Sequence, residues 1–188
     1  MPPTWLTKLA TGRNVVLTLT VWLTFNLLLF NFGPYQTLRN ASGNLELLEE
    51  IFGYTAREGY TRIFILGQAG RALYENFQWL DFVNAALTFA ALTLALIYVF
   101  TRLFPSGHPV FWFVWLPALT LVGELVENFS LLSLLRLFPA EAPWLVDLAS
   151  IATQFKLAVA STSFPVLLLA SAHLLARKFW PRSSASQN

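Results

Sequence analysis

The 188-residue chain contains no cysteine, and this absence excludes several kinds of chemistry at once. Without thiols there is no disulfide bond, no thiol redox catalysis and no thiolate ligand for a metal ion. A quinone-linked four-helix oxidoreductase with a Cys-x-x-Cys pair is therefore excluded. The two histidines, His108 and His173, lie far from the acidic residues described below, so we expect no metal site and no bound cofactor.

Charged residues are also scarce, at 12% of the chain, compared with about a quarter in soluble domains. Hydrophobic residues make up 56%, and the mean hydropathy is +0.57. A chain of this length has too little interior to hide so much apolar surface from water. The 7 Trp and 17 Phe suit a lipid-facing exterior with aromatic rings near the membrane interfaces. The composition predicts an integral membrane protein.

Four apolar segments are long enough to cross the hydrocarbon layer, which takes about 20 helical residues. They cover residues 15–32, 79–104, 109–137 and 144–176. We expect Pro117 and Pro165 to kink the last two helices without breaking them, because neighbouring helices can satisfy the freed backbone groups. The predicted fold is an all-α membrane protein, a four-transmembrane-helix bundle in one membrane domain over residues 1–188. The first apolar segment exceeds a signal-peptide core in length, which favours an uncleaved anchor.

The basic residues predict how the bundle lies in the membrane. With four spans, both termini and the turn at 102–108 share one side. All charged residues of that side are basic: Lys8, Arg13, Arg102, Arg177, Lys178 and Arg182. The other side mixes arginine with glutamate. By the positive-inside rule we expect a multi-pass protein with both termini cytoplasmic, followed by a polar tail at 181–188.

Residues 33–78 form the one sizeable segment outside the predicted spans, and we expect a short helical cap there. Thr55 and Glu58 match a capping box, which predicts a helix over 56–66, closed by the glycine that follows. Residues 44–52 have the spacing of a second, shorter amphipathic helix. Two interpretations of the cap stay open: a lid over the mouth of the bundle, or an interfacial cap without a moving part.

Polar residues inside the apolar segments are the strongest indication of function, since an ionisable side chain within a span is costly. They fall on one face of each helix, at spacings of three or four residues. Thr88 and Thr153 extend two of these faces, and Asn26 is a polar residue of the first span. The candidate ligand-binding residues are Asp81, Asn84, Glu124, Glu127, Asn128 and Lys156.

The acids and the lysine also share one depth. Counted along the helices from the basic side, Asp81, Glu124, Glu127 and Lys156 lie about 24–31 Å away, at 1.5 Å per residue. A hydrocarbon layer is roughly 30 Å thick, so this level is close to the outer interface. We therefore expect one shared polar site beneath the cap.

The charges of this predicted site do not balance, because three carboxylates face one ammonium group. A protonated carboxyl, a bound cation, or an arginine from the cap, with Arg71 the nearest in sequence, would each correct the excess. Alternatively, an ion pair of Lys156 with Glu127 or Asp81 only fixes the helix register, close enough to the interface to reach water.

Several motifs together carry a resemblance. They are Gly53-Tyr54-Thr55, Gly67-x-x-Gly70-Arg71-x-x-Tyr74, Asp81, Glu124-x-x-Glu127-Asn128, Phe138-Pro139 and Thr153-x-x-Lys156. This order resembles a group of small, uncharacterised four-span integral membrane proteins, and it covers about residues 53–156. The resemblance implies the four-span fold and these site residues, and it implies no activity.

Three classes of function stay open. The first is binding or transport of a small amphipathic or cationic ligand, for which a homodimer would be suitable, since four helices are few for a transporter. The second is a membrane-embedded acid–base enzyme on a lipid-like substrate, with Glu124 or Glu127 as general acid. The third is an accessory subunit of a larger membrane complex. Besides the lipid bilayer and these partners, we expect no nucleic acid, because no soluble domain has room to exist.

Overall fold

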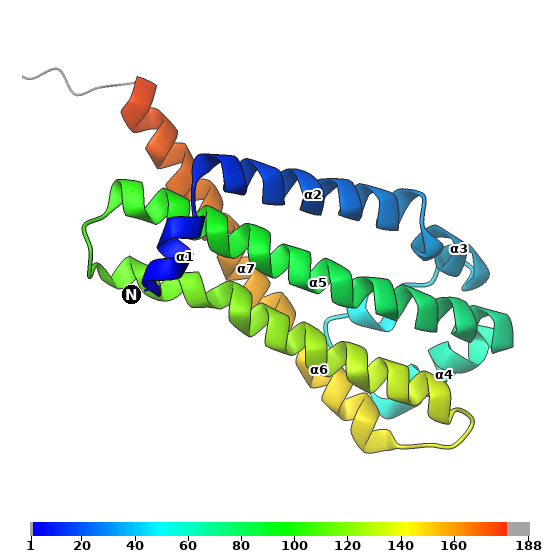
Figure 1. Ribbon diagram of the computed structural model, residues 1–188. Helices are drawn as coiled ribbons and strands as arrows, with labels where there is room; N and C mark the ends of the chain where they lie inside the picture. The colour runs from blue at the N-terminus through cyan, green and yellow to red at the C-terminus, as the bar shows by residue number, and fades with distance from the viewer. Residues whose placement is uncertain (1, 180–188) are drawn as a thin grey trace, which may run out of the picture.

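A computed structural model describes residues 2–179 of the chain, and this part is helical without any β-strand (Figure 1). Four regions are long and apolar enough to cross a membrane, which indicates a multi-pass membrane protein and confirms the predicted four-helix bundle. Their principal helices are α2 (Gly12–Asn31), α5 (Gly67–Leu103), α6 (Leu116–Leu137) and α7 (Pro143–Phe179). A short α1 (Thr4–Leu9) precedes them. The predicted tail at 181–188, with Arg182, lies outside the described residues.

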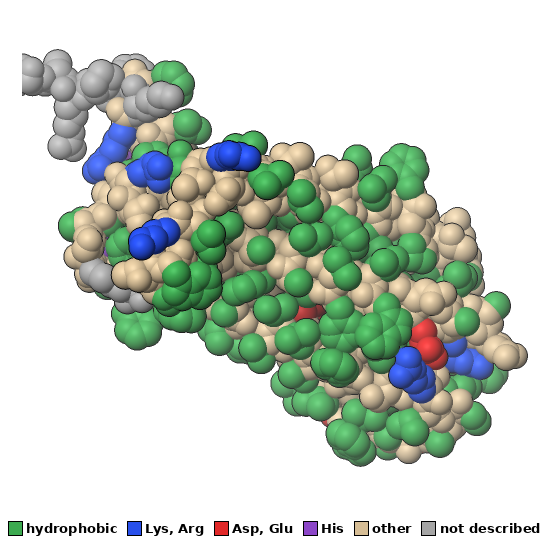
Figure 2. Space-filling model, in the orientation of Figure 1, with side chains coloured by type: hydrophobic (Ala, Val, Ile, Leu, Met, Phe, Trp, Pro, Cys, Tyr) green, Lys and Arg blue, Asp and Glu red, His purple; other side chains and the backbone are tan. Residues whose placement is uncertain are grey.

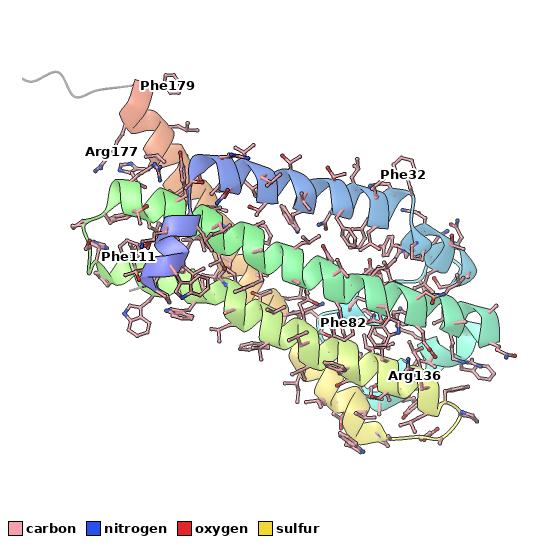
Figure 3. All side chains as sticks on the ribbon, in the orientation of Figure 1. Phe32, Phe82, Phe111, Arg136, Arg177 and Phe179 are labelled. Carbon is pink, nitrogen blue, oxygen red and sulfur yellow. The ribbon has the colours of Figure 1, made fainter. Side chains whose placement is uncertain are left out.

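The helices α2, α5 and α6 run side by side, while α7 crosses obliquely behind them (Figure 1). Residues of α5 contact α2, α6 and α7, so α5 is the central helix of the bundle. Arg177 and Phe111 lie toward one end of the bundle, Arg136 lies toward the other, and Phe82 lies between them (Figure 3). The loop between α6 and α7 and the cap share the Arg136 end.

The helix α5 begins at Gly67, well before the predicted start at residue 79. Residues 67–78 were assigned to the cap because they include the charged residues Arg71 and Glu75. In the structure the same segment is helical and places Tyr74 and Phe77 in the apolar core. Burial of these rings holds the extra turns of helix against the core. Gly67 has φ +63°, a left-handed conformation that favours glycine, and it closes the preceding cap helix at the same point.

The cap contains α3 (Pro34–Ala41), a single 3₁₀ turn η1 (Leu48–Glu50) and α4 (Ala56–Ile65). The capping box of α4 is confirmed, because Glu58 accepts from the Thr55 backbone N–H at 2.7 Å and the Thr55 hydroxyl accepts from the Glu58 N–H at 3.3 Å. The predicted helix at 44–52 is wrong, since only η1 is helical there. Gly43 and Asn44 have positive φ, which turns the chain after α3 at the point where this helix was expected to begin.

The prolines behave differently from each other. Pro117 lies in the first turn of α6, after the 3₁₀ segment η2 (Pro109–Trp115), so it starts a helix and does not kink one. The first turn is where a missing backbone N–H costs least. Pro165 lies inside α7, which continues through it as expected.

The cap packs into the bundle and not flat on its surface. Leu48 of η1 and Ile63 of α4 are almost fully buried, which is worth about 1.5–3 kcal/mol each relative to exposure to water. The Tyr54 backbone N–H donates to Ser150 Oγ of α7 at 2.9 Å. Gly59 lies so close to α7 that an added Cβ would come within 2.7 Å of Val146 Cγ1. The cap is therefore part of the wall of the site.

Two apolar cores fill the two ends of the bundle. One joins the cap to α5, α6 and α7 through residues such as Leu48, Phe77 and Leu131. The other, near the basic end, centres on Leu96 and Phe100 of α5. A group of polar residues of α5, α6 and α7 lies between these cores, and we call it the polar layer: Asp81, Asn84, Glu124, Glu127, Asn128, Thr153 and Lys156.

Candidate functional site

Lys156 of α7 connects two acids of α6 in the polar layer. Its Nζ lies 2.9 Å from Glu124 Oε2 and is also ion-paired with Glu127. The Thr153 hydroxyl, one turn away on α7, bonds to the same Glu127 carboxylate. Glu127 and Thr153 have no exposed surface, and Lys156 is buried. The predicted pairing of Lys156 with Glu127 is therefore present, within a wider group.

Gly123 explains how α6 and α7 come close enough for these pairs. A Cβ added at Gly123 would lie 3.0 Å from Lys156 Cβ and 3.4 Å from Lys156 Cα. Contacts this short to the first atoms of a side chain and its backbone leave little freedom for adjustment. A glycine one residue before Glu124 thus sets the depth at which the lysine meets its acids.

Asp81 of α5 forms the second half of the polar layer. Its Oδ2 accepts from Asn128 Nδ2 at 3.0 Å, and its Oδ1 accepts from Asn84 Nδ2 at 3.2 Å. Asn84 Oδ1 in turn accepts from Asn26 Nδ2 of α2 at 2.9 Å. The charge of Asp81 also acts on Glu124 and on Lys156, so the two halves are neighbours. The structure therefore brings all six predicted residues into one layer.

Glu49 of the cap is a site residue that the sequence did not indicate. Tyr74 of α5 donates its hydroxyl to Glu49 Oε2, while Glu49 Oε1 is sealed from solvent without a hydrogen-bond partner in residues 2–179. Burial, and next the charge of Glu127, raise the pKa of Glu49 to about 8. Tyr54 lies beside Thr153 in the same wall, and burial raises the pKa of its hydroxyl well above the ordinary value. The cap thus adds a fourth acid to the layer.

The expected arginine does not balance these acids. Arg71 places its guanidinium over the Phe138 ring, 4.4 Å from the centroid, and donates to the Ile63 carbonyl at 3.4 Å. It therefore turns toward the cap and the α6–α7 loop, because an aromatic face and a carbonyl there hold it. With Glu49 included, the layer holds four acids and one ammonium group, and a pKa of about 8 keeps Glu49 protonated at neutral pH. Three acids then remain for one ammonium group, and further protonation or a bound cation is left to correct the excess.

Two buried amide side chains have polar atoms without a hydrogen-bond partner among the described residues. Gln78 of α5 is fully buried, and neither its Nε2 nor its Oε1 has a hydrogen-bond partner. It lies one turn from Tyr74 and from Asp81 on the same face of α5. The Oδ1 of Asn128 is likewise without a partner. A buried polar group without a partner costs about 1–3 kcal/mol. Binding of a polar ligand that forms hydrogen bonds with both amides would remove this cost.

One acid of the polar layer keeps some exposed surface. Glu124 lies on the same face of α6 as the fully buried Glu127 and Asn128, yet its side chain is 22% exposed. Figure 2 shows acidic side-chain atoms in the middle of the hydrophobic face, where α5 and α6 run side by side. The rings of Phe82 and Phe129, 4.8 Å apart, join the two helices on the cap side of this level (Figure 3). We call this place the α5–α6 opening.

Histidine takes no part in the layer. His108 Nδ1 accepts from the Val110 backbone N–H at 3.2 Å, and its ring stacks on Phe104 with centroids 4.6 Å apart. Within residues 2–179, no group of three or more His, Asp or Glu side chains is arranged to hold a metal ion.

The chain matches no protein-family model, no curated protein and no solved structure. The resemblance of residues 53–156 to small four-span membrane proteins stays a prediction. The argument for a function therefore depends on the geometry of the polar layer.

Proposed function

We propose that the polar layer binds the cationic group of a small amphipathic amine that comes from the lipid through the α5–α6 opening. One observation carries this proposal: Glu124 pairs with Lys156 inside the bundle, and its side chain is still 22% exposed. A structural ion pair alone needs no such exposure. A receptor for a cation needs an acid that the ligand can reach.

The balance of charge supports the same function. Besides Glu49, which its pKa of about 8 keeps protonated at neutral pH, the layer holds three acids and a single lysine, so an added positive charge is stabilised by more than one carboxylate. When an amine takes the place of Lys156 at Glu124, Lys156 keeps its ion pair with the fully buried Glu127. Neither cation is then left unpaired, and this lowers the cost of the exchange.

The remaining groups suit the parts of such a ligand. Asp81 offers a second carboxylate near Glu124, and the Gln78 amide and the Asn128 Oδ1 are free for further hydrogen bonds. The apolar tail would stay in the lipid-facing seam between α5 and α6, beside Phe82 and Phe129. Burial of each methylene adds about 0.8 kcal/mol, so the tail contributes affinity and the layer contributes selectivity.

The orientation of the protein is part of this proposal, with both termini in the cytoplasm. The charges at one end of the bundle support this orientation. That end holds α1 and the turn between α5 and η2, and its charged residues are basic: Lys8, Arg13, Arg102 and Arg177. Asn26 lies in the last third of α2, at the level of the layer, on the side away from that end. The ligand would therefore come from the outer leaflet.

A binding experiment tests the proposal. Dodecylammonium is titrated into the purified protein in dodecyl maltoside by calorimetry, with dodecanol as the neutral probe of equal chain length. We expect Glu124→Gln to weaken dodecylammonium binding at least tenfold and to leave dodecanol binding unchanged. The matched control is Glu75→Gln, an acid of α5 that pairs with Arg136 outside the layer. Equal binding of the two probes, or full binding in Glu124→Gln, would contradict the proposed function.

A further inference from the structure

A groove lies at the outer face of the cap, away from the polar layer. The groove, of about 690 Å³, runs between α4 and the loop from α6 to α7. Its walls include Arg57, Tyr60, Phe64, Phe138, Pro139 and Glu141. A volume of this size accommodates a small ligand or a lipid headgroup. None of the residues that line it belongs to the polar layer, so this site is independent of the proposed function.

Both walls of the groove are held in place. The Ala142 backbone N–H of the loop donates to the Tyr60 hydroxyl of α4 at 2.5 Å, which joins the two walls. Phe138 is held by the Arg71 guanidinium on its ring. The groove is therefore formed by fixed elements before a ligand arrives, and this reduces the entropy lost on binding.

The groove carries one charge of each sign. Arg57 comes from α4 and Glu141 from the loop, both are exposed, and neither forms an ion pair with another described residue. An arginine guanidinium matches a phosphate group. A carboxylate beside aromatic rings matches an ammonium group. The two residues thus offer a partner for a phosphate and a partner for an ammonium group in one groove.

An apolar stripe begins next to the groove and runs along α7. Pro143 lines the groove, and the exposed residues that follow at helical spacing are Trp144, Leu148, Ile151 and Phe155. They extend over eleven residues, about 16 Å along the helix. The stripe lies between the groove and the level of Lys156 on the same helix. The stripe also lies in a helix that is long and apolar enough to span the membrane.

We infer that the groove and the stripe together bind one zwitterionic phospholipid. Arg57 binds the phosphate, Glu141 and the rings of Tyr60 and Phe64 bind the ammonium, and one acyl chain lies on the α7 stripe. An anionic phospholipid satisfies Arg57 but places no cation at Glu141. A soluble phosphate–ammonium compound satisfies both charges but leaves the stripe unused.

Native mass spectrometry of the purified full chain tests this assignment. The protein is offered equimolar phosphatidylethanolamine, phosphatidylcholine and phosphatidylglycerol with identical acyl chains, and separately glycerophosphoethanolamine, which lacks the chains. We expect one retained zwitterionic lipid, with phosphatidylglycerol and glycerophosphoethanolamine each at least tenfold weaker.

Variants separate the two ends of the headgroup. Arg57→Gln should weaken zwitterionic lipid binding about tenfold, while Arg57→Lys keeps part of it as a point charge. Glu141→Gln should remove the preference over phosphatidylglycerol. The controls Arg13→Gln, at the other end of the bundle, and Glu75→Gln should bind as the wild type does, and circular dichroism checks that every variant is folded. Equal retention of phosphatidylglycerol by the wild type, or unchanged binding in Arg57→Gln, would overturn the inference.

Discussion

Lys156 of α7 is ion-paired with Glu127 of α6 inside the bundle, where Lys156 is buried and Glu127 has no exposed surface. Glu124 shares the same ammonium group but keeps part of its surface exposed. The lysine thus pairs with one fully buried acid, Glu127, and with one partly exposed acid, Glu124. This inequality is the basis for assigning a structural role to Glu127 and a ligand-binding role to Glu124.

Replacing the lysine should destabilise the protein strongly. In Lys156→Met, Glu124 and Glu127 lose their counter-ion, and breaking a buried pair in this way costs about 3–5 kcal/mol. Thermal unfolding in dodecyl maltoside measures the loss, and the double variant Lys156→Met/Glu127→Gln should recover part of it. Lys8→Met, at an exposed lysine of α1, is the control. Equal unfolding temperatures for the two single lysine variants would show that the pair contributes little.

The acids of the layer should respond differently to neutral substitutions. Asp81→Asn loses an acceptor for Asn128 or Asn84 and should cost about 1–3 kcal/mol. Glu124→Gln should be neutral or stabilising, because it removes excess negative charge while Lys156 keeps Glu127. Urea or thermal unfolding of both variants gives the comparison. A loss in Glu124→Gln as large as that in Asp81→Asn would favour a purely structural ion pair.

Gly123→Ala should destabilise the protein, although alanine is the better helix former by about 1 kcal/mol. The added methyl group meets Lys156 Cβ at 3.0 Å, and overpacking of this kind costs about 1–3 kcal/mol. Gly12→Ala is the matched control, since its added methyl meets only the side chain of Tyr98. We expect the unfolding temperature to fall for Gly123→Ala alone, and a rise in that variant would show that the helices separate without cost.

The protein should become less stable as the pH rises from about 4.5 to about 8, owing to Glu49. Its pKa is raised from 4.5 in the unfolded chain to about 8 in the folded one, so the folded state holds the extra proton in this window. Stability falls with pH wherever the folded state binds more protons.

The contribution of Glu49 is isolated by difference. Glu49→Gln should flatten the pH dependence of the unfolding temperature relative to the wild type, while Glu46→Gln, an exposed acid of the cap, should leave it unchanged. Parallel pH curves for the wild type and Glu49→Gln would contradict the assignment.

The spacing of charges along the helices was enough to predict which side chains lie together in most of the polar layer. Glu124, Glu127 and Asn128 share a helix face because their positions differ by three and four residues, and that rule depends on one helix only. The common depth of Asp81 and Lys156 followed from the helical rise. Both kinds of inference use local geometry, which a sequence contains.

The same reasoning could not identify Glu49 as an acid of the polar layer. It stands beside Glu50, which binds Arg39 at 2.9 Å on the surface, and nothing in the local pattern distinguishes the two acids. Only the packing of the cap against Tyr74 turns Glu49 inward. The early start of α5 at Gly67 had a similar cause, because tertiary burial of Tyr74 and Phe77 outweighed the polar residues between them.

The most direct test of the central claim is an X-ray map of the protein crystallised with 12-bromododecylammonium, whose bromine is located by anomalous scattering. We expect the amine nitrogen within hydrogen-bond distance of Glu124, the Lys156–Glu127 pair intact, and the bromine peak in the seam between α5 and α6. A map in which Lys156 still pairs with both glutamates and the bromine lies elsewhere would contradict the claim that the polar layer is a receptor for a cation.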